Sequence, residues 1–326
     1  MIEKLIESSK GLLKKGSDPS LQYSRIPFNI AVLDKLTGGG IPQKRMTLLT
    51  GATNVGKSYL ASQIVSCAQK QGLMAAWIDT ELSWDPSWMA KCGIDTDAIL
   101  VSQPLTGEAA FDLMRALMKA QVGIIVLDSI AGLVPTSLQD EDFSYSPLAW
   151  QARFVNQSLP RLLPYLQEGA ALVVINQIRS SLGPVSLDAM PGGLAQVFFS
   201  HFILQLRREG WIEENKQKIG FNITVRCRKS KVGGDPYQEC TIPFRLDGGI
   251  DVVETVIREG LDKGLIQQAG PWYKWDKEKL MGMNNVRKFF TNDDQALAML
   301  KEKLLITGVH DDAASKGLHT TGADSS

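Results

Sequence analysis

The sequence lacks the features that define several large classes of protein. The four cysteines, Cys67, Cys92, Cys227 and Cys240, form no CxxC pair, so we predict free thiols and neither a disulfide framework nor a zinc site. No apolar run approaches the ~20 residues of a membrane span. Two Glu and two Lys interrupt the first ten residues, which excludes the apolar core of a signal peptide. These absences predict a cytoplasmic protein with no membrane partner.

The chain also lacks an excess of charge of either sign and any internal repeat. Lys plus Arg number 35, and Asp plus Glu number 35. Net charge therefore gives no indication of a nucleic-acid partner, and any basic binding face would be local and balanced elsewhere. With 326 residues, of which 44% are hydrophobic, the chain is long enough for one large domain and a smaller one.

What the sequence has is a glycine-rich loop that fits the pattern GxxxxGK[ST], with an apolar run before it and a helical pattern after it. Gly51 and Gly56 would let successive backbone N–H groups face one anion. Lys57 would reach the β- and γ-phosphates of a nucleoside triphosphate, and the Ser58 hydroxyl would bind Mg²⁺. A chance glycine-rich turn is the alternative. The predicted site for ATP and Mg²⁺ comprises Gly51, Ala52, Thr53, Asn54, Val55, Gly56, Lys57, Ser58 and Tyr59.

Around this loop, strand-like apolar runs alternate with amphipathic helices, which predicts an α/β fold with a mostly parallel sheet and helices on both faces. The predicted strands are Met46–Thr50, Ala75–Asp79, Ile99–Ser102, Gly123–Asp128 and Ala170–Asn176. The predicted helices are Lys57–Gln71, Pro86–Cys92, Gly107–Ala120 and Leu148–Gln167. Three later β-rich runs, which predict an antiparallel extension of this sheet, are Phe202–Arg207, Gly220–Arg228 and Gln238–Phe244.

Both ends of the chain differ from this central pattern. Apolar residues between Ile2 and Leu13 follow a helical period, which predicts a short helix. Gly16–Ser20 predicts a turn and linker. This short helix either packs on its own domain or docks on a neighbouring copy. The aromatic, lysine-containing stretch Pro271–Trp275 lies in a predicted small α+β domain. The predicted division is 1–24 for an oligomerisation helix and linker, 25–248 for the core, 249–307 for the small domain and 308–326 for a disordered tail.

Polar residues follow several predicted strands, at the edge where a parallel sheet binds ligands. Asp128 is expected to orient Mg²⁺ and its waters, with helix capping as the alternative. Glu81 could activate a water against the γ-phosphate, with a solvated loop charge as the alternative. Gln177 is suited to sensing the γ-phosphate and leads into the irregular stretch Ile178–Gly193. A second irregular stretch is Leu138–Pro147. Together, the two stretches would let the nucleotide state control the binding of another ligand.

Beyond the phosphate loop, the sequence contains several further motifs. They are Ser102-Gln103-Pro104 with Thr106-Gly107-Glu108, Val126-Leu127-Asp128-Ser129, Ile175-Asn176-Gln177-Ile178-Arg179, Gly192-Gly193, Lys229-Ser230-Lys231 and Ala269-Gly270-Pro271-Trp272-Tyr273. These motifs resemble those of the RecA-type recombinases. The resemblance extends from about Ile26 to Leu305 and implies a RecA-like P-loop NTPase core with a short N-terminal helix and a small C-terminal domain.

This resemblance implies roles for individual residues at the nucleotide. Glu81 matches the catalytic glutamate, and Gln177 matches the switch that couples the γ-phosphate to DNA binding. Asp85 and Trp88 match positions that hold the adenine, although the family more often has Tyr in place of Trp88.

The resemblance also implies an interface between copies of the chain. Lys229 and Lys231 match lysines that reach a neighbour's phosphates, where they would stabilise transition-state charge as arginine fingers do. An exposed basic strand end is the alternative. Phe198 matches an aromatic residue at that interface, with core packing as the alternative.

Two loops that grip single-stranded DNA are implied at Leu138–Pro147 and Ile178–Pro191. Arg153 and Arg179 are the phosphate-contact candidates. Leu182 is a candidate wedge between bases, or an exposed loop leucine. The DNA-binding prediction comprises Arg153, Arg179, Leu182, Gly192 and Gly193.

Together these features predict an ATP-dependent recombinase that forms a filament on single-stranded DNA, pairs it with duplex DNA and hydrolyses ATP in response to DNA. Its predicted partners are both forms of DNA, further copies of itself, a single-strand-binding protein and loader proteins. The alternatives are a RecA-fold motor or helicase, and a weakly hydrolysing recombination mediator. A short segment before the phosphate loop and unusual DNA loops favour a phage-encoded or divergent member.

Overall fold

The structure, a computed structural model, describes residues 1–138, 147–178, 190–214 and 216–304. The chain divides into two compact units. The first comprises Met1–Asn29, Leu33–Arg207 and Val225–Glu239, and the second Ile30–Val32, Arg208–Thr224 and the residues from Cys240 on. The predicted domain boundaries after residues 24, 248 and 307 stay predictions. Among the described residues, none of the helices combines the length and apolar character that crossing a bilayer requires.

The first unit contains a sheet with the strand order β9-β8-β3-β7-β6-β4-β5. Neighbouring strands from β8 to β5 are parallel, which confirms the predicted α/β class. The strands are β3 (Met46–Gly51), β4 (Ala75–Asp79), β5 (Ile99–Ser102), β6 (Ile124–Asp128), β7 (Ala171–Gln177), β8 (Phe202–Glu214) and β9 (Gln217–Ser230). A separate two-stranded pair joins β1 (Arg25–Ile26) to β2 (Ile41–Pro42).

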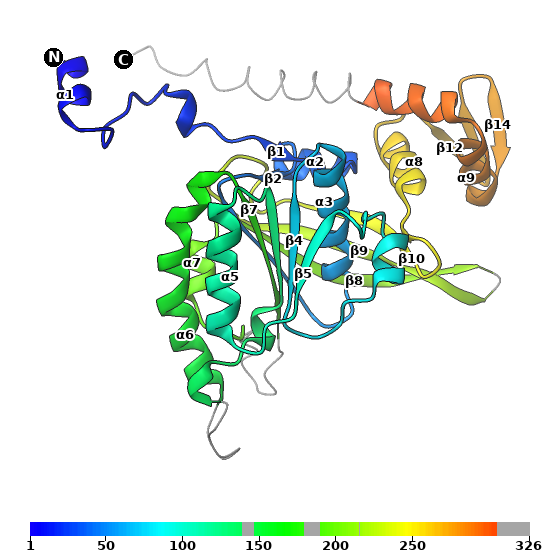
Figure 1. The fold of residues 1–326 in the computed structure, drawn as a ribbon. Helices are drawn as coiled ribbons and strands as arrows, with labels where there is room; N and C mark the ends of the chain where they lie inside the picture. The colour runs from blue at the N-terminus through cyan, green and yellow to red at the C-terminus, as the bar shows by residue number, and fades with distance from the viewer. Residues whose placement is uncertain (139–146, 179–189, 215, 305–326) are drawn as a thin grey trace, which may run out of the picture. The chain divides into compact units, whose positions relative to one another are not determined.

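Helices cover both faces of this sheet, with α5, α6 and α7 on one side and α3 on the other (Figure 1). The helices of the unit are α1 (Ile2–Ser8), α3 (Lys57–Lys70), α4 (Pro86–Lys91), α5 (Gly107–Lys119), α6 (Pro147–Leu162) and α7 (Ala195–Phe199). Helix α2 (Ala31–Thr37) has its first two residues in the second unit and the rest in the first. Alternate residues of the buried strands face opposite sides. Ile125 and Leu127 of β6 accordingly pack in one core with Met114 of α5 and Leu159 of α6. The apolar core thus holds the carboxyl ends of the strands at one edge.

In the second unit, the distal parts of β8 and β9 join β10 (Glu239–Arg245) and β11 (Gly249–Ile250). The unit continues with α8 (Val252–Asp262), a three-stranded antiparallel sheet and two helices. These are β12 (Gln267–Ala269), β13 (Trp272–Trp275), β14 (Glu278–Met281), α9 (Met283–Asn292) and helical residues 294–304. The aromatic stretch of the sequence is β13, and its Trp275 packs on Phe290 of α9 with ring centroids 5.7 Å apart.

Three features of the fold differ from the sequence prediction. The helix predicted up to Leu13 ends at Ser8, because Lys10 and Gly11 have φ values of 51° and 86°, outside the right-handed helical region. The helix predicted over Leu148–Gln167 becomes a 3₁₀ helix at Leu163, because Pro164 has no N–H for an α-helical bond. The prediction that Phe202–Arg207 extends the sheet antiparallel was wrong: β8 is parallel to β3, because α7 lies in the crossover before it.

Candidate nucleotide-binding site

The phosphate loop lies between β3 and α3, as the sequence predicts. A close approach at Gly51 and a positive φ at Gly56 explain its glycines. A Cβ on Gly51 would lie 2.4 Å from the carbonyl oxygen of Leu206, and Gly56 has a φ of 89° at the start of α3. Both positions therefore favour glycine. The 14-residue helix α3 directs its free N–H groups and the positive end of its dipole at the loop, an arrangement that fits a phosphate.

Lys57 is buried in this loop, and carbonyl groups of the loop hold its ammonium group. Its Nζ donates to the carbonyl oxygens of Gly51 at 3.2 Å and Ala52 at 2.6 Å. Burial lowers the pKa of Lys57, while the nearby carboxylates of Asp128 and Glu81 raise it. A cation held in this way is positioned to meet phosphate oxygens at the mouth of the loop.

Ser58 and Asp128 form an oxygen-rich pair beside the lysine. Asp128 is buried at the end of β6, and burial raises its pKa to about 6; a hydrogen bond from Ser58 acts in the opposite direction. The hydroxyl and carboxylate oxygens are ligands that Mg²⁺ prefers, so the pair fits the predicted ion. The alternative of a helix cap fails, because the N-cap of the following 3₁₀ helix is Ser129.

A hydrogen-bonded cluster connects Glu81 to the phosphate loop. The Glu81 Oε1 accepts from Gln177 Nε2 at 3.0 Å and from Ser129 Oγ at 2.5 Å. The Oε1 of Gln177 accepts from Thr53 Oγ1 at 3.4 Å. Glu81 is exposed, but it is not a free solvated charge. Gln177 thus lies between the candidate base and the loop that would hold the phosphates.

Asp79 has a structural role here that the sequence analysis did not assign. Its buried carboxylate accepts from the backbone N–H of Glu81 at 3.2 Å and of Trp84 at 2.9 Å, and from Gln103 Nε2 at 2.8 Å. Asp79 is the register partner of Asp128 on the neighbouring strand. It thereby fixes the turn that carries Glu81. The available signal was an acidic residue that ends an apolar strand, the same signal that identified Asp128.

Comparison with known proteins agrees with this geometry. The family model for the RecA N-terminal domain matches residues 2–251. The chain is 33% identical to Protein RecA of Aquifex pyrophilus over 291 residues, which cover 87% of this chain and 83% of that one. It is 32% identical to Protein RecA of Thermus aquaticus over 307 residues, 92% of this chain and 90% of that one. The chain belongs to the RecA family. At the level of that family, it is a RecA-type recombinase.

The RecA-type positions for adenine lie at the start of α4. The Asp85 carboxylate caps this helix and accepts from the backbone N–H of Ser87 at 2.8 Å and of Trp88 at 3.2 Å. Both Asp85 and Trp88 are exposed, so their side chains are open to a ligand. Their contact with adenine stays a prediction.

The two lysines of the RecA-type KxK motif lie together at the end of α7. Lys229 Nζ donates to the carbonyl oxygens of Val197 at 2.5 Å and Phe198 at 3.1 Å, and Lys231 Nζ donates to Phe198 at 3.4 Å. Burial, and then the charge of Lys231, lower the pKa of Lys229. Phe198 is 66% exposed, which excludes core packing within this chain. The roles of these residues between copies stay predictions.

The candidate DNA-binding residues are only partly described. The exposed Arg153 lies with its guanidinium 5.2 Å from the ring centroid of Trp150, which is also exposed. Gly192 is buried, and a Cβ there would lie 2.5 Å from Ile130 Cγ2; Gly193 follows it, two residues before α7 begins. Arg179, Leu182 and most of both predicted DNA loops lie outside the described residues. The DNA contacts all stay predictions.

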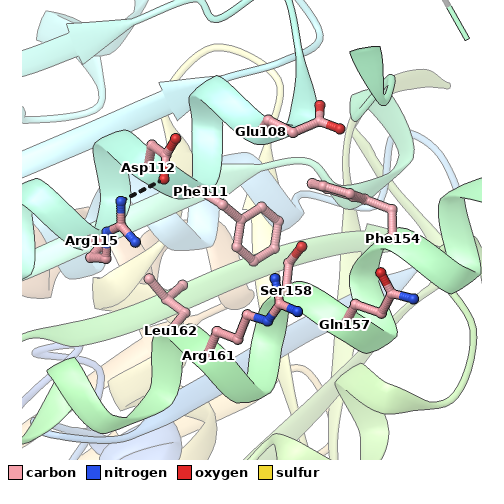
Figure 2. Close-up of a pocket in the computed structure, with 9 residues that line it drawn as sticks. All are labelled: Glu108, Phe111, Asp112, Arg115, Phe154, Gln157, Ser158, Arg161 and Leu162. Atoms are coloured by element: carbon pink, nitrogen blue, oxygen red, sulfur yellow. Dashed lines mark hydrogen bonds and ion pairs between the residues drawn. The ribbon is translucent and has the colours of Figure 1, made fainter. Parts of the chain in front are cut away.

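A separate cavity of about 300 Å³ lies between α5 and α6 (Figure 2). Phe111 and Leu162 form part of its lining, and the Asp112–Arg115 ion pair of 2.8 Å lies at its side. The cavity shares no lining residue with the phosphate loop or with the Glu81 cluster. It is therefore not part of the candidate nucleotide site.

The buried carboxylate of Asp128 predicts a measurable cost to stability. Folding raises its pKa from 3.8 to about 6, so the stabilising effect of its protonated form is lost as pH rises through about 6. We expect Asp128→Asn to raise the free energy of unfolding at pH 7.5 by up to about 3 kcal/mol, with a smaller gain at pH 5. Urea denaturation at both pH values measures this. An equal gain from the exposed Asp97→Asn, or no gain at pH 7.5, would contradict it.

Proposed function

We propose that the chain is an ATP-dependent DNA recombinase that assembles on single-stranded DNA, pairs it with a homologous duplex and hydrolyses ATP when bound to DNA. The observation that carries this proposal is the hydrogen-bonded link from Thr53 through Gln177 to Glu81. It joins the phosphate loop, the candidate base and the start of the segment that would contact DNA. A nucleotide sensor in this position could report ATP hydrolysis to that segment.

Each residue of the cluster has a task in the proposed hydrolysis. Lys57 and the N–H groups of the loop hold the phosphates. Glu81 accepts a proton from the attacking water, whose oxygen bonds to the γ-phosphorus as the bond to the bridging oxygen of ADP breaks. Mg²⁺ held by Ser58 and oriented by Asp128 would neutralise phosphate charge. Gln177 orients Glu81 through their 3.0 Å hydrogen bond.

The proposed site is completed by a second copy of the chain. Lys229 and Lys231 would enter the neighbour's site and stabilise charge on the transferred phosphoryl group. The exposed N-terminal helix supports assembly, because Ile2 and Leu5 on α1 are 67% and 53% exposed and no residue of α1 is buried. Burying these apolar side chains against a neighbouring copy would favour assembly, because it removes apolar surface from water. The head-to-tail interface would be heterologous and would generate a filament.

DNA would be held through its backbone and by stacking, without regard to sequence. The Arg153–Trp150 pair supports this, since Arg beside an exposed aromatic ring can contact phosphate while the ring stacks on a base. Binding by such contacts weakens as salt rises. Single-strand-binding and loader proteins, a cytoplasmic location and a phage origin stay predictions.

The role of Glu81 predicts a selective loss of hydrolysis. Glu81→Gln removes the proton acceptor but keeps an oxygen that can accept from Gln177 and Ser129. We expect DNA-stimulated phosphate release to fall by roughly 10²–10⁴-fold, with binding of a fluorescent ATP analogue retained. Glu168→Gln, which changes an exposed glutamate of the same charge, is the control. DNA-stimulated release that is unchanged in Glu81→Gln would show that another group is the base.

The shared site predicts that two inactive variants restore each other. Glu81→Gln supplies intact lysines, and the double variant Lys229→Ala/Lys231→Ala supplies an intact loop and Glu81. In an equal mixture on single-stranded DNA, about a quarter of the junctions would combine both intact halves, so hydrolysis should reach about that share of the wild-type rate. Steady-state phosphate release measures it. A mixture no more active than either variant alone would place the lysines in their own chain's site.

A further inference from the structure

Two amide side chains, Asn176 and Gln196, are fully buried between the end of β7 and the start of α7. Asn176 Nδ2 donates to Gln196 Oε1 and to the carbonyl oxygen of Pro191, both at 2.8 Å. Gln196 Nε2 donates to the carbonyl oxygens of Pro191 at 2.6 Å and Gly193 at 3.0 Å. Asn176 Oδ1 accepts from the backbone N–H of Gln177 at 2.8 Å. Every N–H of both amides has a partner.

Packing alone does not require an amide at position 196. A methionine or leucine of similar size would fill the space without the cost of burying a polar group. An amide differs from these residues because its hydrogen bonds are directional, and here they fix one orientation of α7 against β7. The role of the Gln196 amide is therefore to position α7 rather than to fill space.

The amide pair lies between two parts of the candidate site. On one side, Asn176 precedes Gln177, which bonds to Glu81 and to Thr53 of the phosphate loop. On the other side, Gln196 precedes Val197 and Phe198, whose carbonyl oxygens accept from the KxK lysines. Helix α7 has only five residues, so its two ends cannot move far apart. Along the backbone, the same two parts are separated by residues 178–196.

We propose that Gln196 is a positioning residue that couples the γ-phosphate sensor Gln177 to the lysine pair Lys229 and Lys231. The Asn176–Gln196 amide pair makes the end of β7 and helix α7 move as one body. A shift of Gln177 that accompanies a change of nucleotide then changes how this copy presents its lysines to the next one. The inference rests on the proposed function, since it needs the lysines to act in a neighbouring site.

The test uses the mixture of the two complementing variants, because it separates the two sides of the site. Gln196→Met removes all the hydrogen bonds of the amide and nearly preserves its volume. Placed in the Glu81→Gln copy, it acts on the side that donates lysines. Placed in the Lys229→Ala/Lys231→Ala copy, it acts on the side that donates the loop. Both mixtures are compared with the mixture that lacks Gln196→Met, by phosphate release on single-stranded DNA.

We expect Gln196→Met to lower the rate roughly tenfold in the lysine donor and by less than twofold in the loop donor. A general loss of structure would lower both equally, and that result, or no loss in the lysine donor, would overturn the inference. If the mixture without Gln196→Met is inactive, the site shared between copies in the proposed function fails instead. Circular dichroism melting checks that each variant folds, and Gln196→Leu replaces Gln196→Met if the methionine packs badly.

A second readout tests the coupling in an otherwise complete chain. Because each copy would pass the state of its own nucleotide to the next site, the dependence of hydrolysis on ATP concentration should be sigmoidal. In Gln196→Met alone, we expect the Hill coefficient to fall toward one and kcat to fall, while the half-saturating ATP concentration changes by less than twofold. An equally sigmoidal curve in the variant would contradict coupling through Gln196.

Discussion

The parallel pairing of β3 with β7 is the constraint on which the rest of the site depends. Its register places Gly51 opposite Gln177 and Thr50 opposite Asn176. Successive side chains of a strand face opposite sides, so this one register directs Gln177 to the phosphate loop and buries Asn176 against α7. A slip of one residue would exchange the positions of the two amides and separate the loop from Gln177. The apolar residues of both strands, which are fully buried, hold the register.

The same edge of the sheet concentrates charge that the fold would be more stable without. Lys57 and Asp128 are buried there, at a cost that neighbouring hydrogen bonds only partly offset. The raised pKa of Asp128 is the visible result of that cost. Buried charges with a shifted pKa in such a position are typical of functional sites. Within one chain this arrangement supplies the phosphate loop, the candidate base and the candidate sensor, while the two lysines lie elsewhere, at the end of α7.

Much of this organisation was predictable from the sequence, because strand periodicity and strand-end chemistry are local signals. They located the phosphate loop, the parallel strands and the polar residues Glu81, Asp128 and Gln177. Other features depend on tertiary contacts and leave no periodic pattern. Asp79 supports the site only because the following turn folds back and donates hydrogen bonds to its carboxylate. In the sequence, Gln196 is a single polar residue among Ala195, Val197 and Phe198. The early end of α1 depends on backbone angles at Lys10 and Gly11 that the apolar period does not reveal.

In the proposed function, bound ATP is sufficient for the pairing of DNA, and its hydrolysis releases the protein. The most direct test is strand exchange between circular single-stranded DNA and a homologous linear duplex, with ATP or with a non-hydrolysable ATP analogue. We expect joint molecules under both conditions, because bound nucleotide is sufficient for pairing, and release of the protein from the products with ATP alone. The absence of joint molecules under both conditions would contradict the proposed function.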